Sequence, residues 1–340
     1  MSEASPHRRR PRYPGKNPRR FEEKYKELSP EKYPETVEKV LASGKTPAGS
    51  HVPVMLEEVL EALRPQPGET AVDCTLGHGG HASAILRHLG PAGLLLGLDA
   101  DPVELPKTEA RLRDLGFGPE VFKVRRSNFA GLLRAMAAEG IERADCILAD
   151  LGVSSMQLDT PGRGFSTKIA GPLDMRMNPG RGIPASQLVK KVLPAPLADI
   201  LRENADEPHA ETIAAAIAGK DFAVTTDLAG AIRAALRSVA ADEAEKSVRR
   251  VFQALRIEVN EEFGALDSML RALPFCLNPG GRAAILTFHS GEDRRVKKAF
   301  QAGQRGGVYS AVARDVMRPT PEECRANPRA ASAKLRWAVL

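Results

Sequence analysis

Residues 71–81 read Ala71-Val72-Asp73-Cys74-Thr75-Leu76-Gly77-His78-Gly79-Gly80-His81, an apolar run that passes into a loop rich in glycine. The run predicts a strand over 70–75, and the spacing of apolar residues in 82–89 predicts that a helix follows the loop. Small residues allow a ligand to approach closely, and a helix start offers N–H groups and the positive end of its dipole. The loop therefore favours a bound ligand, although a structural turn without a ligand has the same composition.

The loop lacks the spacing of two phosphate-binding motifs. It is not the G-x-G-x-x-G of dinucleotide-binding proteins, and no Lys-Ser or Lys-Thr pair follows that would mark a P-loop. A glycine-rich turn after a first strand also suits the methionine part of S-adenosylmethionine. This cofactor is the ligand that the loop predicts.

Strand and helix patterns alternate on both sides of the loop. Strands are expected at 93–98, 121–124, 144–149, 283–288 and 334–339, and helices at 55–63, 102–115, 130–139, 248–269 and 293–301. This alternation implies right-handed βαβ units and a parallel sheet. Residues 156–182, rich in Gly, Pro, Asp and Arg, break the pattern, and 185–247 show helical spacing with no convincing strand. We expect an α/β fold over 49–157 and 248–340, with an all-helical insertion over 158–247.

Composition excludes several classes of protein. Hydrophobic content of 42% and charged content of 27% are ordinary for a soluble globular protein. No apolar run approaches the roughly 20 residues that span a bilayer, and the N-terminus lacks a secretory signal. The four cysteines form no CxxC pair, so we expect no metal site and a reducing, cytoplasmic location.

Positive charge gathers at the N-terminus. The net charge is +6, and residues 1–20 hold seven Arg and Lys side chains against one acid, Glu3. With several prolines and few apolar residues, the basic N-terminal extension 1–48 is expected to be largely disordered. It suits an arm that neutralises RNA phosphates, or else a solubilising tail or the remnant of a targeting segment.

Asp99 follows the second apolar run, roughly 20 residues after the loop. An acidic residue in this place accepts hydrogen bonds from ribose hydroxyls. Asp101, just before Pro102, fits a helix cap better. We therefore assign Asp99 to ribose and Asp101 to the cap.

Asp150 ends another predicted strand, in Asp150-Leu151-Gly152-Val153-Ser154-Ser155. Ligands of open α/β sheets bind at this edge. An exocyclic amino group is a poor nucleophile because its lone pair is delocalised into the ring. A carboxylate that holds its N–H hydrogens favours a pyramidal nitrogen facing a sulfonium methyl, and alignment for in-line transfer supplies rate without a metal. The sequence leaves open whether Asp150 plays this catalytic part or only contacts the cofactor.

Two downstream segments carry candidate substrate contacts. Arg163 and Arg176 suit phosphate, and Phe165 suits stacking on a base, whereas a packed loop is the alternative for this segment. The methionines beside Arg176 are expected in the core. His289, at the end of a predicted strand, is a candidate base or RNA contact, or a structural side chain.

Seven ordered segments, spread over 51–340, resemble the bacterial ribosomal RNA small-subunit methyltransferase H family, also called MraW. They are His51-Val52-Pro53-Val54, 75–81, 150–158, 162–177, Phe252-Gln253-Ala254-Leu255-Arg256-Ile257, 288–298 and 327–336. The resemblance implies a Rossmann-like class I methyltransferase domain interrupted by a helical substrate-recognition domain. It further implies S-adenosylmethionine-dependent N4-methylation of a cytidine in the decoding region of small-subunit rRNA.

The resemblance also assigns residues. The family's cofactor contacts fall on Gly79, Gly80, His81, Asp99, Phe129, Asp150 and Gln157, and Phe129 follows the third strand, where an apolar ring flanks adenine. Gly291 and Ala170 stand where members usually have Leu and Asp. The extension is not typical of bacterial members and looks more like plastid-type relatives.

These points predict an enzyme that works on small-subunit rRNA or on the assembling small ribosomal subunit, with no membrane partner. A homodimer and a plastid location are left open. The rival hypotheses are an amino-group methyltransferase acting on DNA and a non-catalytic ribosome-assembly factor that kept the fold.

Overall fold

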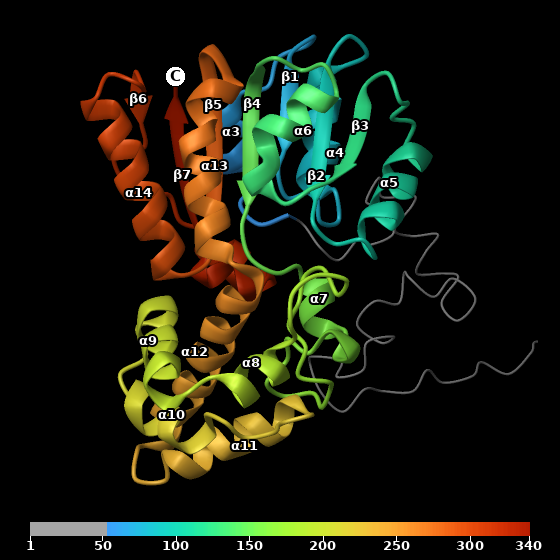
Figure 1. The fold of residues 1–340 in the computed structure, drawn as a ribbon. Coiled ribbons are helices and arrows are strands. Elements are labelled where there is room, and N and C mark those ends of the chain that lie inside the picture. The colour runs from blue at the N-terminus through green and yellow to red at the C-terminus, as the bar shows by residue number, and fades with distance from the viewer. Residues whose placement is uncertain (1–52) are drawn as a thin grey trace, which may run out of the picture. The chain divides into compact units, whose positions relative to one another are not determined.

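The computed structural model describes residues 53–340, and these build one seven-stranded sheet. The strand order is β3-β2-β1-β4-β5-β7-β6 (Figure 1). The strands are β1 (Thr70–Asp73), β2 (Leu94–Asp99), β3 (Phe122–Arg126), β4 (Ala144–Asp150), β5 (Leu277–Thr287), β6 (Ala311–Val312) and β7 (Lys334–Val339). All neighbours pair in parallel except those that involve β7. The predicted α/β fold is confirmed.

The chain reverses its direction of winding between β1 and β4. From β1 it proceeds outward to β2 and β3, then returns to place β4 on the other side of β1. Loops at the carboxyl ends of β1 and β4 diverge at such a switch point and leave a crevice for ligands. Asp73 and Asp150, the last residues of these two strands, therefore lie at the edge where a ligand is expected.

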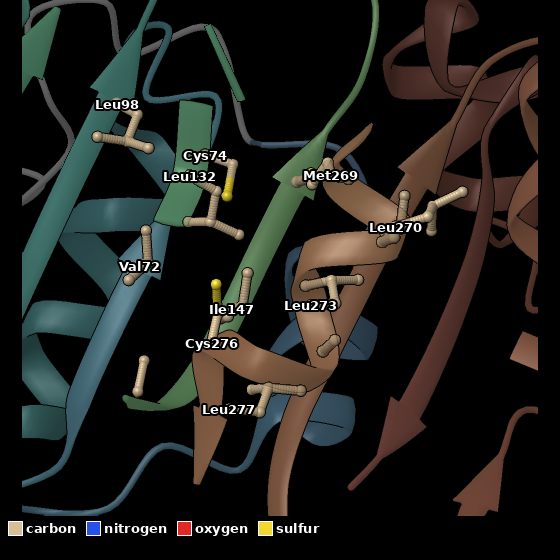
Figure 2. Packing of buried hydrophobic residues seen from close by; sticks show 14 of the residues in the cluster. Val72, Cys74, Leu98, Leu132, Ile147, Met269, Leu270, Leu273, Cys276 and Leu277 are labelled. Carbon is tan, nitrogen blue, oxygen red and sulfur yellow. The ribbon is translucent and has the colours of Figure 1, made fainter. Parts of the chain in front are cut away.

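Helices cover both faces of the sheet. One face packs against α3 (Leu56–Leu63), α4 (Gly80–Leu89) and α5 (Leu105–Asp114). The other packs against α6 (Leu132–Ala138), α13 (Glu262–Cys276) and α14 (Ser290–Arg305), and Figure 2 shows Cys276 of α13 beside Ile147 of β4. Successive strand residues point to opposite faces, so the central strands β1, β2 and β4 are mostly apolar, whereas β3 at the edge of the sheet carries Lys123, Arg125 and Arg126.

A second group of helices has its own apolar core. It comprises α7 (Ser155–Asp159), α8 (Ala185–Lys191), α9 (Pro194–Ala205), α10 (Ala210–Ile217), α11 (Thr225–Ala235) and α12 (Ala241–Asn260). Their buried side chains form a cluster from Phe165 to Leu255 that includes no strand of the sheet. In Figure 1, α12 leads from this helical part to α13 beside the sheet. It passes without a break through the boundary predicted at 247/248.

The residues predicted to be helical over 248–269 form two helices instead of one, α12 and α13, which meet at Glu261. This residue adopts a left-handed conformation with φ 52°. Nδ2 of Asn260 donates to the carbonyl oxygens of Arg256 and Met175, and its Oδ1 accepts the N–H of Met177. Helix α12 thus ends where Asn260 contacts a loop that is distant in the sequence. Hydrophobic periodicity does not report such a contact.

Three other boundaries differ from the prediction. β5 starts at Leu277 and contains Pro279-Gly280-Gly281, which form a bulge with Gly280 at φ 77°. The helix expected from Pro102 begins at Leu105, after a turn. The two-residue strand β6 carries too short a pattern for a sequence-based prediction.

Two short helical segments complete the chain near the sheet, α15 (Pro321–Ala326) and the 3-10 helix η4 (Pro328–Ser332). The N-terminal extension, with its predicted disorder, lies outside the described residues. Within 53–340, no helix combines the length and hydropathy needed to cross a membrane.

Candidate active site

The glycine loop is anchored to β2 by backbone contacts. The N–H of Leu76 donates to the carbonyl of Leu98 at 2.7 Å, and the N–H of Gly77 donates to Oδ2 of Asp99 at 2.8 Å. The side chain of Leu76 is buried over Gly97, where a Cβ would come within 2.8 Å of it. A glycine in β2 thus allows the loop to lie directly against the neighbouring strand.

Two loop glycines have no room for a side chain. Gly79 has φ 72°, and a Cβ there would lie 3.0 Å from side-chain carbons of both Leu112 and Thr108. At Gly80 a Cβ would come within 2.5 Å of Pro53. The loop is therefore closely packed against these neighbouring side chains. Helix α4 begins at Gly80 without a side-chain cap, so its first N–H groups are available to an anionic ligand.

Asp99 connects the loop to the turn before α5. Oδ2 accepts the Gly77 N–H, and Oδ1 accepts the Asp101 N–H at 2.8 Å. Burial raises the pKa of Asp99, and these two hydrogen bonds oppose the rise. Each carboxylate oxygen has a second lone pair, so Asp99 still has the capacity to accept ribose hydroxyls.

Asp101 is more than the helix cap that its position predicts. Its Oδ1 accepts the N–H groups of Val103 and Glu104, in the turn before α5. Its Oδ2 accepts Nε2 of Gln157 at 2.8 Å and Nη1 of Arg163 at 2.7 Å. The carboxylate is almost fully buried, so this oxygen holds α7 and the following loop against the turn before α5.

Asp150 and His81 face each other beside the loop. The N–H of Asp150 donates to Oγ1 of Thr75 at 2.6 Å, and Thr75 in turn donates to Oδ1 of Asp73. Nδ1 of His81 lies 3.7 Å from Oδ2 of Asp150, while Nε2 of His81 lies 3.0 Å from the carbonyl oxygen of Val54. The Val54 contact requires a proton on Nε2, so the Nδ1 lone pair faces Asp150.

The protonation states of this group follow from burial. Burial, with Asp73 and Glu292 nearby, raises the pKa of Asp150 to about 8. Burial lowers the pKa of His81 to about 4 and raises the pKa of Asp73 to about 7. At neutral pH, Asp150 is therefore largely protonated and His81 is neutral. Oδ1 of Asp150 has no hydrogen-bond partner among the described residues.

The other two predicted cofactor residues are Phe129 and Gln157. Phe129 starts the 3-10 helix η2 (Phe129–Gly131), just after β3, and its partly buried ring packs against the sheet core. Gln157 is buried, with its amide shared between Asp101 and the N–H of Ser154. The structure brings Gln157 to the site through Asp101.

The predicted substrate residues have other partners in this structure. Arg163, 12% exposed, donates to Asp101 and to the carbonyl oxygens of Arg176 and Met177. The guanidinium of Arg176 donates two hydrogen bonds of 2.8 Å to the carboxylate of Asp174. Phe165 is 7% exposed and belongs to the core of the helical part. These placements match the packed-loop alternative, and the methionine Met175 is buried as expected.

His289 lies at the carboxyl end of β5, one residue before α14, beside a residue that sequence reasoning missed, Glu292. Nε2 of His289 lies 3.2 Å from Oε1 of Glu292. Together with Glu262, these side chains form a group whose ligand atoms lie within 4.8 Å of one another. The i, i+3 spacing of a His and a Glu at a helix start is the signal that could have found the pair.

The residues present fit S-adenosylmethionine. The uncapped start of α4 suits a carboxylate, Asp99 suits ribose, and the unpartnered Oδ1 of Asp150 marks a polar contact that a ligand can complete. The described residues thus offer groups suited to the carboxylate and the ribose hydroxyls of this cofactor.

Comparison with known proteins gives the family. The description "MraW methylase family" matches residues 48–339. "Ribosomal RNA small subunit methyltransferase H 1" of Lachnoclostridium phytofermentans is 48% identical, covering 98% of this chain and 93% of its own length. The protein of the same name from Agathobacter rectalis is 47% identical, covering 100% and 99%. These bacterial alignments include the N-terminal segment, so its expected likeness to plastid-type relatives is not supported.

The similarity to solved structures is weaker. TrmN from Thermus thermophilus matches with a TM-score of 0.39 and 15% identity, over 86% of this chain and 49% of its own. Fibrillarin from Aeropyrum pernix, solved with S-adenosyl-L-methionine, matches with a TM-score of 0.37 and 11% identity, over 83% and 74%. The near full-length match of the family description and the identity of the bacterial relatives decide the assignment: this chain belongs to the MraW methylase family of S-adenosylmethionine-dependent methyltransferases.

Proposed function

We propose that the chain transfers a methyl group to N4 of a cytidine in the decoding region of small-subunit rRNA, with Asp150 at the reaction centre. The observation that carries this proposal is the buried, unpartnered Oδ1 of Asp150 at the carboxyl end of β4. An acceptor left without a partner in a buried place costs about 1–3 kcal/mol, so it calls for a donor from the substrate. The names of the bacterial relatives support small-subunit rRNA as that substrate.

The cofactor half of the site is assigned residue by residue. The N–H groups after Gly79 and Gly80 receive the methionine carboxylate, Asp99 accepts the ribose hydroxyls, and Phe129 flanks adenine. S-adenosylmethionine, when bound, supplies an activated methyl group on a sulfonium. His81 and Gln157 act indirectly. The imidazole of His81 orients Asp150, and the side-chain amide of Gln157 orients Asp101.

Asp150 serves the amino group of the target base. A largely protonated carboxyl keeps a free lone pair on Oδ1, and this atom accepts one N–H of the cytosine amino group. The hydrogen bond fixes the nitrogen and favours a pyramidal geometry. The rate then comes chiefly from alignment of the nitrogen with the methyl group.

The helical part, 158–247, is the proposed substrate-recognition domain. The target cytidine must leave its stack to reach the edge of the sheet. His289 contacts it from the end of β5. Arg163, Phe165 and Arg176 already have partners within the protein in this structure. Their proposed role is therefore to hold the shape of the loop that meets the RNA.

Methylation assays on 30S particles, naked rRNA and duplex DNA test the proposal, followed by mass mapping of modified cytidines. We expect methylation of a single small-subunit cytidine at N4, by the protein acting in the cytoplasm. Activity only on DNA would show a DNA amino-methyltransferase. A folded protein that does not bind S-adenosylmethionine in calorimetry would be a non-catalytic assembly factor. Sedimentation of the free protein decides whether it forms a homodimer.

A further inference from the structure

His289 and Glu292 form a buried pair at the carboxyl end of β5. Their side chains are 10% and 4% exposed, and Nε2 of His289 faces Oε1 of Glu292 at 3.2 Å. Oε2 of Glu292 accepts the N–H of Phe288 at 2.8 Å, which fixes the carboxylate beside the ring. A carboxylate at one ring nitrogen places the proton on that nitrogen and the lone pair on the other.

The surrounding charges keep Glu292 ionised. Burial raises the pKa of Glu292, but the contact with His289, the charge of Arg256 and the Phe288 N–H outweigh it, so the pKa is lowered. Arg256 also donates two hydrogen bonds of 2.8 Å to Glu262. The ring of His289 therefore lies beside a fixed negative charge that stabilises an imidazolium.

Nδ1 of His289 makes no hydrogen bond within the described part of the chain. Both ring nitrogens are buried and neither makes a hydrogen bond of good geometry there, but Nε2 lies 3.2 Å from the Glu292 carboxylate and Nδ1 has no such contact. The charged groups that face the ring from other elements are Glu262, Arg256 and Asp206, in addition to Glu292 on its own helix. None of them accounts for Nδ1, so its lone pair is available to a ligand.

The pair lies next to the proposed reaction centre. β4 and β5 run in parallel with Asp150 opposite Leu286, and the N–H of Leu151 donates to the Leu286 carbonyl at 3.0 Å. His289 follows Leu286 by three residues at the same edge of the sheet. Glu292 is close enough to raise the pKa of Asp150.

Methylation of an amino group releases a proton, and the two nearer groups are poor acceptors for it. Asp150, with a pKa of about 8, already carries a proton at neutral pH. His81, with a pKa of about 4, is a very weak base. A further acceptor is needed at this edge.

We propose that His289 is the catalytic base that accepts this proton on Nδ1, and that Glu292 is its positioning residue. The inference rests on the proposed N4-methylation. The bond between N4 and the methyl carbon forms as the carbon–sulfur bond breaks, and the electron pair of that bond goes to sulfur. The positively charged N4 then gives one proton to Nδ1, and the imidazolium, paired with Glu292, later releases a proton to water.

The spacing of Glu262, His289 and Glu292 also suits a metal ion, and this is an alternative outcome of the test. Both oxygens of Glu262 already accept hydrogen bonds from Arg256, whose positive charge opposes a second cation. A metal on Nε2 would put the proton on Nδ1 and abolish its basicity.

Single-turnover methylation of 30S particles by the full chain tests the proposal, with His88→Gln as a control on an exposed histidine. His289→Ala is expected to slow methyl transfer about 100-fold or more, with partial rescue by imidazole. Its affinity for S-adenosylmethionine in calorimetry stays within about twofold of wild type. Glu292→Gln lowers the rate and moves the acidic limb of the pH profile, where the base becomes protonated, to lower pH, because the imidazolium loses its counter-charge.

A readout independent of turnover comes from NMR of protein labelled with ¹⁵N-histidine. Free wild type is expected to show His289 protonated at Nε2 in its neutral form, and Glu292→Gln is expected to lose this preference. The inference is overturned by a His289→Ala rate within twofold of wild type, by a proton on Nδ1, or by one equivalent of metal that His289→Ala no longer holds. Inactivity of wild type and His88→Gln alike would instead defeat the proposed function.

Discussion

Nδ1 of His81 lies 3.7 Å from Oδ2 of Asp150, and the pKa values of the two groups shift in opposite directions. Burial disfavours the charged form of each, so the pKa of the acid rises to about 8 and that of the base falls to about 4. At neutral pH both of these groups are therefore largely uncharged.

Stability should fall as pH rises toward 8, and Asp150→Asn should reduce this fall. The unfolded carboxyl ionises near 3.8 but the folded one near 8, so unfolding releases a proton between these values. Between pH 7 and 8 the imidazole of His81 is largely neutral in both states and adds little slope. Thermal and urea unfolding across this window measure how steeply the free energy of unfolding falls with pH. For Asp150→Asn this slope should be smaller than that of wild type by up to about 1.4 kcal/mol per pH unit. Asp114→Asn, an exposed control, should keep the wild-type slope; equal slopes in all three proteins would contradict the prediction.

Asp101→Ala should destabilise the protein strongly. It removes the acceptor of Gln157 and Arg163 and leaves a nearly buried guanidinium without its carboxylate. The free energy of unfolding in urea should drop by about 3–5 kcal/mol. The double variant Asp101→Ala/Arg163→Met should recover part of this loss, since no buried charge then stays unpaired. A loss below about 1 kcal/mol in the single variant is the opposing result.

Gly79→Ala should weaken cofactor binding through packing. Gly79 has φ 72°, and a Cβ would press on Leu112 and Thr108 at 3.0 Å. Gly140→Ala is a matched control, because Gly140 has φ 73° and nothing within 4 Å of its Cβ position. Each should lose about 1–2 kcal/mol of stability from backbone strain, and Gly79→Ala should also lose about tenfold in affinity for S-adenosylmethionine by calorimetry. Equal affinities in the two variants would refute the packing argument.

Asp99→Asn should lower the affinity for S-adenosylmethionine by about 10–100-fold. The carboxylate accepts Gly77 and Asp101 N–H groups in the free protein, and the amide keeps only one acceptor atom. Loss of a charged acceptor for the ribose hydroxyls is worth about 1.5–3 kcal/mol. Calorimetry measures the change against Asp114→Asn, which should bind like wild type. Unaltered binding by Asp99→Asn would remove Asp99 from the cofactor site.

Removal of residues 1–20 should flatten the salt dependence of rRNA binding. This segment carries seven basic side chains against one acid. The slope of log affinity against log salt should shrink by about 0.7–0.9 for each phosphate that the shortened protein no longer neutralises. Filter binding at several salt concentrations gives the slopes. An unchanged slope would make the segment a solubilising tail.

The sequence by itself determined the α/β class, the parallel strands, the glycine loop and the acidic residues at strand ends. These features depend on periodicity and on glycine chemistry, which act over a few neighbouring residues. The positions of Asp99 and Asp150 at the carboxyl edge of the sheet were predictable, because each residue ends a parallel strand. The last strand, Lys334–Val339, was predicted with its observed bounds for the same local reason.

Only the tertiary structure decided what the polar side chains contact. Arg163 is held by Asp101, 62 positions earlier in the chain, and Asn260 ends α12 by binding a loop 85 positions earlier. Glu292 comes close to Asp150 because β5 pairs with β4, a strand that precedes it by more than a hundred residues. Such contacts arise from packing between distant segments. Local sequence patterns do not report such packing. Arg163 therefore suggests an RNA contact in the sequence, whereas in the fold it binds Asp101.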